Sequence, residues 1–159
     1  MDVRLAQTPA DYATFAALAT DYEQDLPPQL RHTDAAEQLR DPAAIFGPPN
    51  AAFIAAIDDR PAGCIAMFHH DAQTAIIRRL YVAHAFRGHG VGRALVTAVI
   101  AEATKRSYER LTLDTDPTLL ESAYRLYLSL GFEDCEPYAP MHYEHAVCMQ
   151  LRLRGRHTP

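Results

Sequence analysis

Three glycines at alternate positions mark the stretch of this sequence that is best suited to chemistry. They lie in Arg87-Gly88-His89-Gly90-Val91-Gly92-Arg93, between the strand-forming run Arg79–Val82 and a segment with apolar residues at helical spacing. Glycine lets the backbone approach a ligand closely, where a Cβ would block it. A helix that starts directly after such a loop points unpaired N–H groups and the positive end of its dipole at one place. The loop therefore predicts an anion site, most naturally for a phosphate.

Three interpretations of this glycine loop stay open on the residues alone. A Rossmann fingerprint needs G-x-G-x-x-G after the first strand of a repeated parallel unit, but here the third glycine comes one residue early and the strand is the fourth expected. A P-loop needs Gly-Lys followed by Ser or Thr, whereas Gly92 is followed by Arg93 and Ala94. The third interpretation is a helix start whose glycines serve tight packing alone.

The elements that must position the loop follow from periodicity and from turn residues. The predicted strands are Asp2–Ala6, Ala51–Ile57, Ala62–Phe68, Ala75–Val82, Leu111–Asp114, Phe132–Glu136 and His145–Leu153. The first predicted helix is opened by Thr8-Pro9-Ala10-Asp11 and ended by Pro27-Pro28, and a shorter second one begins at Asp34 with Glu37 at capping-box spacing. A third helix follows the glycine loop to about Arg106. The fourth runs from about Thr118 to Leu130, with Gly131 as its C′ residue. This order predicts an α/β domain with a mixed sheet, in which one strand–helix–strand crossover is parallel and the flanking strands are antiparallel.

Composition narrows the class of protein further. At 159 residues the chain predicts one domain, and its net charge of −5 argues against a generic nucleic-acid binder. No apolar run is long enough to cross a bilayer, and the first residues do not resemble a signal peptide. Cys64, Cys135 and Cys148 fit no metal or disulfide framework, and we expect them to be small buried hydrophobes of a cytoplasmic protein. Histidines do not suggest a metal site either, because the neighbours in the pairs His69-His70 and His142/His145 should point apart in extended chain.

Two motifs together resemble one known family. Leu80-Tyr81-Val82 followed by Arg87-Gly88-x-Gly90-x-Gly92-Arg93-x-Leu95 resembles the acetyl-CoA loop of the GNAT superfamily of N-acetyltransferases. Ala123-Tyr124-Arg125-Leu126-Tyr127-x-x-x-Gly131-Phe132 resembles the helix and exit turn near the carboxyl end of that superfamily. The resemblance covers about residues 51–153 and implies the GNAT fold, a central mixed and mostly antiparallel sheet flanked by helices.

The resemblance also implies how acetyl-CoA would bind as co-substrate. The backbone N–H groups of Arg87–Arg93 would hold its pyrophosphate, and the strand Leu80–Val82 would pair with its pantetheine arm. The implied cofactor-binding residues are Leu80, Tyr81, Val82, Arg87, Gly88, His89, Gly90, Val91, Gly92 and Arg93.

Tyr127 is the residue to which the resemblance gives a catalytic role. Its spacing alone predicts a core position, because it shares a helix face with Leu120, Ala123 and Leu130. In the family, the matching tyrosine faces the thioester sulfur. Tyr127 would therefore donate a hydrogen bond or a proton to the departing CoA thiolate.

The acceptor amine and the base that deprotonates it are not determined by the sequence. Many family members carry a glutamate on the strand before the loop, whereas Ala75-Ile76-Ile77 has no acid. Candidates elsewhere are Glu23, Asp25, His69, His70 and His142, and no base is assigned. The acceptor would be a small-molecule or peptide amine, bordered by the segments Tyr22–Arg40 and Pro137–Glu144, with Tyr138, Met141, His142 and Tyr143 as candidate lining residues. The rival function is an acyl-CoA-binding module without transferase activity, and a homodimer is a further expectation from the resemblance.

Overall fold

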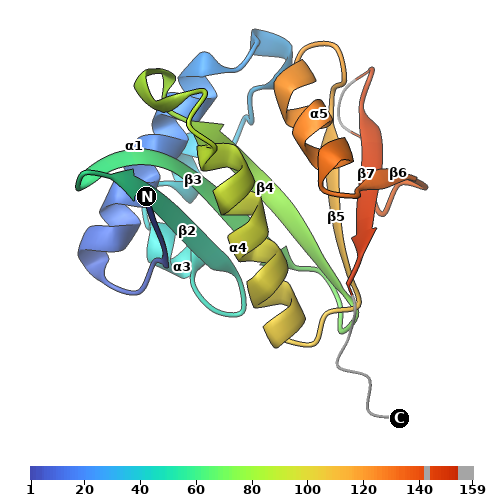
Figure 1. The fold of residues 1–159 in the computed structure, drawn as a ribbon, viewed down its shortest axis with the longest axis horizontal. Coiled ribbons are helices and arrows are strands. Elements are labelled where there is room, and N and C mark those ends of the chain that lie inside the picture. Colours follow the sequence, from blue (N-terminus) through green and yellow to red (C-terminus); the bar gives the residue numbers. More distant parts are fainter. Residues whose placement is uncertain (142–143, 154–159) are drawn as a thin grey trace. The chain divides into compact units, whose positions relative to one another are not determined.

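The computed structural model describes residues 1–141 and 144–153, and its ribbon is drawn in Figure 1. The strands are β1 (Asp2–Leu5), β2 (Ala51–Ile57), β3 (Arg60–His69), β4 (Thr74–Val82), β5 (Arg110–Thr115), β6 (Glu133–Cys135) and β7 (Val147–Arg152). The helices are α1 (Pro9–Asp25), α2 (Ala35–Gln38), α3 (Pro42–Phe46), α4 (Val91–Lys105) and α5 (Glu121–Ser129), with short 3₁₀ turns η1 (Pro28–Leu30) and η2 (His84–Phe86). All seven predicted strands are present in the predicted order, and α3 and the two 3₁₀ turns are additions to it.

The strands form one mixed sheet in the order β1-β2-β3-β4-β5-β7-β6. Strands β4 and β5 are parallel, as predicted for the two ends of a crossover through α4, while β1–β2, β2–β3, β5–β7 and β6–β7 pair antiparallel. Contacts within the chain define two compact units, which we describe separately. The first unit holds Met1–Phe68 and Ile77–Val99, and the second holds His69–Ile76 and Ile100–Pro159.

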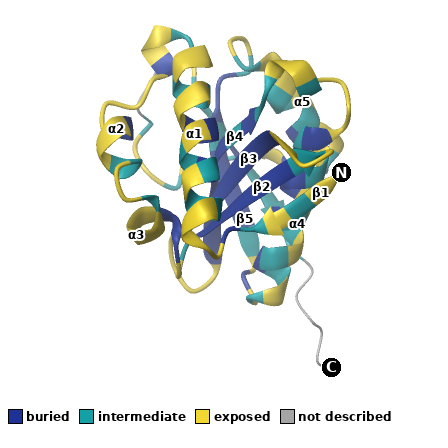
Figure 2. Cartoon of the chain, turned by 90° about the vertical axis from the view of Figure 1, so that its left-hand side faces the viewer, coloured by how far each residue is buried: buried dark blue, intermediate teal, exposed yellow. Residues whose placement is uncertain are grey.

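Helix α1 begins as predicted and packs on the sheet of the first unit. The hydroxyl of Thr8 accepts a hydrogen bond from the Asp11 N–H at 3.1 Å, while the Asp11 carboxylate accepts one from the Thr8 N–H at 3.3 Å, which completes a capping box. The helix ends at Asp25, directly before Leu26 and the Pro27-Pro28 pair. Its inner face carries Phe15, whose ring lies 4.7 Å from that of Phe46 on α3. Figure 2 shows the buried strands β2 and β3 behind α1, whose outer face is exposed.

The segment after α1 is less regular than predicted. Asp34 does stand at the N-cap of α2, but its side chain makes no capping hydrogen bond and instead accepts one from the Gln38 side chain at 3.0 Å. The helix is one turn long and ends at Gln38. A separate helix, α3, begins at Pro42, which suits the first helical position because proline has no N–H to leave unpaired.

A close approach between β3 and the end of β4 fixes the position of the glycine loop. A Cβ on Gly63 would lie 2.5 Å from the Tyr81 carbonyl oxygen and 3.1 Å from side-chain carbons of Val91 and Leu95. Only glycine leaves room there for β4 and for the first turns of α4. The Ala83 N–H also donates to the Ala62 carbonyl at 2.8 Å, so β3 holds the chain at the point where the loop begins.

In the second unit, α5 is shorter than the predicted helix from Thr118 to Leu130. The side chain of Asp116 accepts hydrogen bonds from the N–H groups of Thr118 and Leu119 at 2.8 and 2.9 Å. This Asx turn delays the helix start, because aspartate competes for the backbone N–H groups that open a helix. Gly131 follows the helix with a φ of 95°, which confirms it as the left-handed C′ residue.

The three cysteines all lie in strands and carry free thiols. Cys64 and Cys148 are buried, as expected, whereas Cys135 is half-buried. Cys135 on β6 stands directly opposite Cys148 on β7, with their sulfur atoms 3.0 Å apart, a pairing that their spacing in the sequence did not suggest. Burial raises the pKa of Cys148 to about 12 and raises that of Cys64 still further, so neither thiol is a ready nucleophile.

Candidate active site

Strand β4 breaks its extended conformation at Arg79, just before the predicted pantetheine-binding run. Arg79 has a φ of 61°, a left-handed value that is rare for a residue with a long side chain. Leu80, Tyr81 and Val82 follow, with Tyr81 buried and its two neighbours half-buried. A residue held in such a conformation persists only where the surrounding structure fixes it, and it often marks a functional segment.

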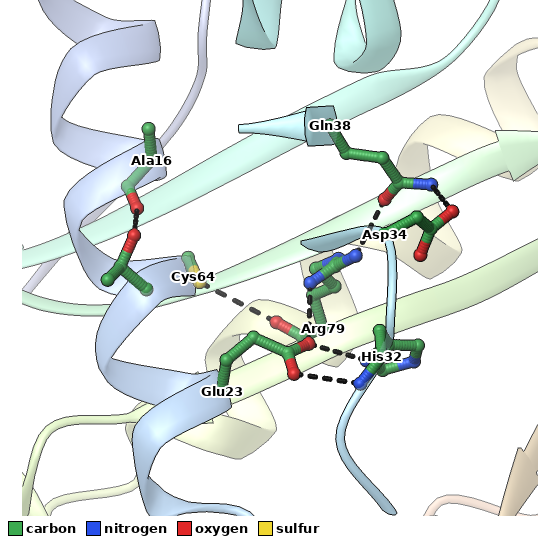
Figure 3. Close-up of polar contacts among 8 residues, drawn as sticks. Ala16, Glu23, His32, Asp34, Gln38, Cys64 and Arg79 are labelled. Atoms are coloured by element: carbon green, nitrogen blue, oxygen red, sulfur yellow. Dashed lines mark hydrogen bonds and ion pairs between the residues drawn. The ribbon is translucent and has the colours of Figure 1, made fainter. Parts of the chain in front are cut away.

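The side chain of Arg79 explains how this conformation is held. It is only 3% exposed, and its Nη1 donates to Oε1 of Glu23 on α1 at 2.7 Å. Its Nη2 donates to Oε1 of Gln38 on α2 at 2.6 Å, and the guanidinium lies over the Phe46 ring at 5.8 Å. Figure 3 shows the hydrogen bonds of Arg79 with Glu23 and Gln38. A buried arginine therefore joins both N-terminal helices to the strand that precedes the glycine loop.

Glu23 is the centre of this network. Its carboxylate also accepts a hydrogen bond from the His32 N–H at 3.0 Å and contacts Nδ1 of the His32 ring (Figure 3). Burial raises the pKa of Glu23, but the hydrogen bonds and charges of His32 and Arg79 outweigh burial and bring the pKa below its ordinary value. Glu23 is therefore ionised at neutral pH, and both of its oxygens are engaged.

The last turn of α1 contacts the glycine loop through a second carboxylate, Asp25. Its Oδ1 lies 2.8 Å from Nε2 of His84, and its Oδ2 accepts a hydrogen bond from Nη2 of Arg87 at 2.9 Å. Arg87 also donates from Nε to the Val82 carbonyl at 3.0 Å. The hydrogen bonds from Arg87 and His84 lower the pKa of Asp25. These groups are much more exposed than the Glu23 network, so a ligand has access to Arg87.

The glycine loop itself is exposed and is shaped by two left-handed residues. Gly88 and Gly90 have φ values of 82° and 78°, and a Cβ built on either would meet nothing within 4 Å. The glycines are thus required by the backbone conformation rather than by crowding within the protein. Helix α4 begins at Val91, so the N–H groups of its first residues point toward the loop. This arrangement fits a phosphate.

Tyr127 lies in the second unit and is buried on α5. It is 5% exposed, and its ring packs on that of Phe132 with the centroids 5.4 Å apart. The Phe132 N–H donates to the Tyr127 carbonyl at 3.0 Å, which closes the turn after the helix. This confirms the core position that its spacing predicts, while the catalytic role stays a prediction.

The other candidate residues of the second unit form two aromatic pairs. His69 lies 2.7 Å from the Tyr108 hydroxyl through Nδ1, and His70 packs against the ring of Tyr138, whose hydroxyl donates to Asp114 at 2.7 Å. Met141 is half-buried, and His142 and Tyr143 lie outside the described residues. Within the described ranges, no three metal-ligating side chains gather at one place.

Sequence reasoning missed Arg79, His32 and Gln38 as members of the site. A signal for Arg79 was present, since a charged residue inside an apolar strand of a small domain must be paired if it is buried. The identity of its partner could not be inferred, because Glu23 lies 56 residues earlier in the chain. Glu23 and Asp25, which the sequence offered as candidate bases bordering the acceptor pocket, instead form ion pairs with Arg79 on β4 and with Arg87 in the glycine loop.

A pocket of about 660 Å³ opens beside this network in the first unit, within the predicted acceptor segment. One wall comes from α1, and the other comes from the segment that leads into α2 and from α2 itself. Its lining residues are Thr20, Glu23, Gln24, Arg31, His32, Thr33, Ala35, Ala36, Leu39 and Arg40.

The fold and the loop together define a family of acyltransferases. Residues 15–132 match the family described as Acetyltransferase (GNAT) family, so the chain belongs to it. Over 156 residues the chain is 31% identical to an uncharacterized N-acetyltransferase of Schizosaccharomyces pombe, covering 96% of this chain and 95% of that protein. It is 35% identical to an uncharacterized N-acetyltransferase of Bacillus subtilis, covering 71% of this chain and 72% of the relative.

Solved structures agree on the fold. An aminoglycoside 6′-N-acetyltransferase complexed with coenzyme A superposes with a TM-score of 0.74 at 17% identity, covering 98% of this chain and 99% of that chain. The predicted GNAT fold is confirmed, and the chain is an N-acetyltransferase of the GNAT family.

Proposed function

We propose that this enzyme transfers the acetyl group of acetyl-CoA to a primary amine by direct attack of the amine on the thioester. The observation that carries the proposal is the donor-binding segment. A left-handed break at Arg79 precedes Leu80–Val82, and left-handed Gly88 and Gly90 lead into α4. The membership of the chain in an acyltransferase family supports the same donor class.

In this proposal the backbone does most of the donor binding. Leu80, Tyr81 and Val82 pair with the pantetheine arm, while the N–H groups from Gly88 to Arg93 surround the pyrophosphate. Arg87 adds a charge-assisted hydrogen bond to a phosphate oxygen once it leaves Asp25. The glycines supply the conformation that turns these N–H groups toward one anion.

The chemical step needs no covalent intermediate on the protein. The neutral amine attacks the thioester carbonyl carbon, and backbone N–H groups of β4 stabilise the oxyanion that forms. The amine nitrogen then loses a proton to solvent, the C–S bond breaks, and the thiolate of CoA leaves with the electron pair. Tyr127 donates a hydrogen bond to that sulfur, or gives it a proton that solvent replaces. Direct attack is favoured because the buried Cys64 and Cys148 thiols have raised pKa values and resist ionisation.

Replacing Tyr127 tests the assignment. We expect Tyr127→Phe to lower kcat on the order of 10²-fold, because the proton or hydrogen bond to the departing sulfur is lost, while the KM for acetyl-CoA changes little. Release of free thiol in the presence of an amine panel measures both. Tyr124→Phe on the same helix is the matched control and should retain activity. Unchanged turnover in Tyr127→Phe would leave Tyr127 as a packing residue and overturn its catalytic role.

The rival function is an acyl-CoA-binding module without turnover. Tight binding of acetyl-CoA, with no thiol release across a broad amine panel, would favour that function over ours.

We also propose a single domain over residues 1–159, a cytoplasmic location and assembly as a homodimer, each of which rests on sequence and resemblance. In the described part of the chain, no helix combines the length and the apolar character that a membrane span requires.

A further inference from the structure

The pocket between α1 and α2 differs in charge from the rest of the chain. The protein carries a net charge of −5, yet two arginines, Arg31 and Arg40, stand among the residues that line this pocket. Glu23, which also lines it, is paired with Arg79 and so adds no net negative charge. The pocket therefore offers positive charge to a ligand although the chain as a whole is negatively charged.

The two arginines are presented in different ways. Arg31 is anchored, because its Nε donates to the Leu26 carbonyl and its Nη2 to the Gln24 carbonyl, both at 3.2 Å. The exposed side chain of Arg40 makes no hydrogen bond or ion pair with any residue in 1–141 or 144–153. A guanidinium without an internal partner, in a pocket that a second and fixed guanidinium also lines, is suited to bind a planar anion such as a carboxylate.

The remaining walls define what else the ligand carries. Ala35 and Leu39 form an apolar surface, and a volume of about 660 Å³ holds a small molecule rather than a folded protein segment. The ring of His32 is kept in place by Glu23, which in turn is fixed by Arg79. The pocket is thus pre-formed, and two arginines and an apolar surface are among its linings.

We propose that the acceptor is an amine that also carries a carboxylate, as a free amino acid does, and that Arg40 with Arg31 binds this carboxylate. The inference rests on the proposed acetyl transfer and names its substrate class. A polycationic amine would place positive charge against both arginines and would be rejected. The apolar wall receives the side chain of the acceptor.

The test compares matched pairs of acceptors on the full-length protein. Phenylalanine and methionine are each paired with their carboxamides, and O-phosphoethanolamine and spermidine complete the panel, with thiol release as the readout. The carboxamides have the less basic and more readily deprotonated amine, so chemistry alone favours them. We expect kcat/KM for the free acids to exceed that for the carboxamides by about tenfold or more, because the site would be built to pair a carboxylate.

Variants locate the effect in the pocket. Arg40→Gln should raise the KM for the free acid about tenfold and leave the KM for acetyl-CoA and the rate with the carboxamide unchanged. Arg125→Gln is the matched control, since Arg125 is an exposed arginine on α5 paired with Glu121. Circular dichroism and a thermal melt of each variant confirm that it is folded.

Other results of these experiments would overturn either the carboxylate inference or the proposed acetyl transfer. Equal rates with acids and carboxamides, or a preference for spermidine, would overturn the carboxylate inference while leaving acetyl transfer intact. A preference for O-phosphoethanolamine would replace the carboxylate by a phosphate and overturn the stated class. A change in the KM for acetyl-CoA in Arg40→Gln would assign Arg40 to the donor and sink the proposal. No thiol release with any amine would refute the proposed function itself.

Discussion

Two carboxylates at the end of α1, only two residues apart, pair with Arg79 on β4 and with Arg87 in the glycine loop in contrasting surroundings. The pair of Glu23 with Arg79 has side chains 12% and 3% exposed, whereas the pair of Asp25 with Arg87 has side chains 37% and 46% exposed. The two N–O distances, 2.7 and 2.9 Å, are nearly the same. Geometry alone therefore does not distinguish the pairs, and burial decides what each one does.

The buried ion pair of Glu23 with Arg79 is expected to stay formed, whereas the exposed pair of Asp25 with Arg87 can exchange partners. Arg79 cannot leave Glu23 without stranding a charge away from water, which costs several kcal/mol. Arg87 can exchange Asp25 for another anion at little cost, because water screens both charges. One helix end thus fixes the strand that precedes the loop and also occupies the loop arginine that a phosphate would need.

The largest expected effect comes from breaking the buried pair. Arg79→Gln removes the buried cation that faces Glu23 and leaves only the His32 contacts, so we expect the free energy of unfolding to fall by about 3 kcal/mol. Arg87→Gln is the matched control and should change it by about 0–1 kcal/mol. Urea titrations followed by circular dichroism measure both variants. Equal losses of unfolding free energy in the two variants would show that burial does not determine how much each ion pair contributes, and would contradict the comparison.

A smaller effect, with a defined sign, is expected when the pH is lowered. The pKa of Glu23 is lowered in the folded protein relative to 4.5, so its stabilisation is present above that value and is lost as the pH falls through the folded-state pKa. We expect the difference in unfolding free energy between wild type and Glu23→Gln to be largest near neutral pH and to shrink below about pH 4. Asp25→Asn should show the same sign with a smaller amplitude that salt reduces further. A Glu23→Gln difference that stays constant from pH 7 to the acid transition would contradict this assignment; urea titrations at several pH values decide it.

The contrast also shows what the sequence could and could not predict. The strands, the capping box at Thr8 and the left-handed Gly131 were predictable, because each depends on residues a few positions apart. The left-handed Arg79 was not, because its conformation is held by contacts with Glu23 and Gln38, 56 and 41 residues away. Helix α3 was missed for a related reason, since five residues are too few for a periodic pattern and their burial depends on Phe46 packing against α1.

Within the candidate site, the backbone conformation could be predicted, whereas the roles of individual side chains could not. The glycine loop was recognised because left-handed conformations require glycine at particular positions, and Gly88 and Gly90 adopt them. The role of Tyr127 could not be decided in the same way, because a core tyrosine and a catalytic tyrosine both require burial and a helix face. The pocket arginines were equally hidden, since a run of polar residues between two helices looks the same whether or not it lines a cavity.

The smallest expected effect concerns the exposed ion pair of Asp25 with Arg87. Asp25→Asn should leave the free energy of unfolding within about 1 kcal/mol of wild type, yet it releases Arg87 for the phosphates of CoA. We therefore expect CoA to bind a few-fold more tightly to this variant at low salt. The gain should fall as ionic strength rises, because salt already weakens the exposed ion pair by which Asp25 competes with the CoA phosphates for Arg87. Calorimetric titration of CoA at two salt concentrations measures the gain. Asp21→Asn on the same helix removes an equal charge from an exposed residue that has no ion pair among the described residues. A gain in Asp25→Asn that exceeds the gain in Asp21→Asn isolates the contact with Arg87, whereas equal gains would mean that only the overall charge of the helix end matters.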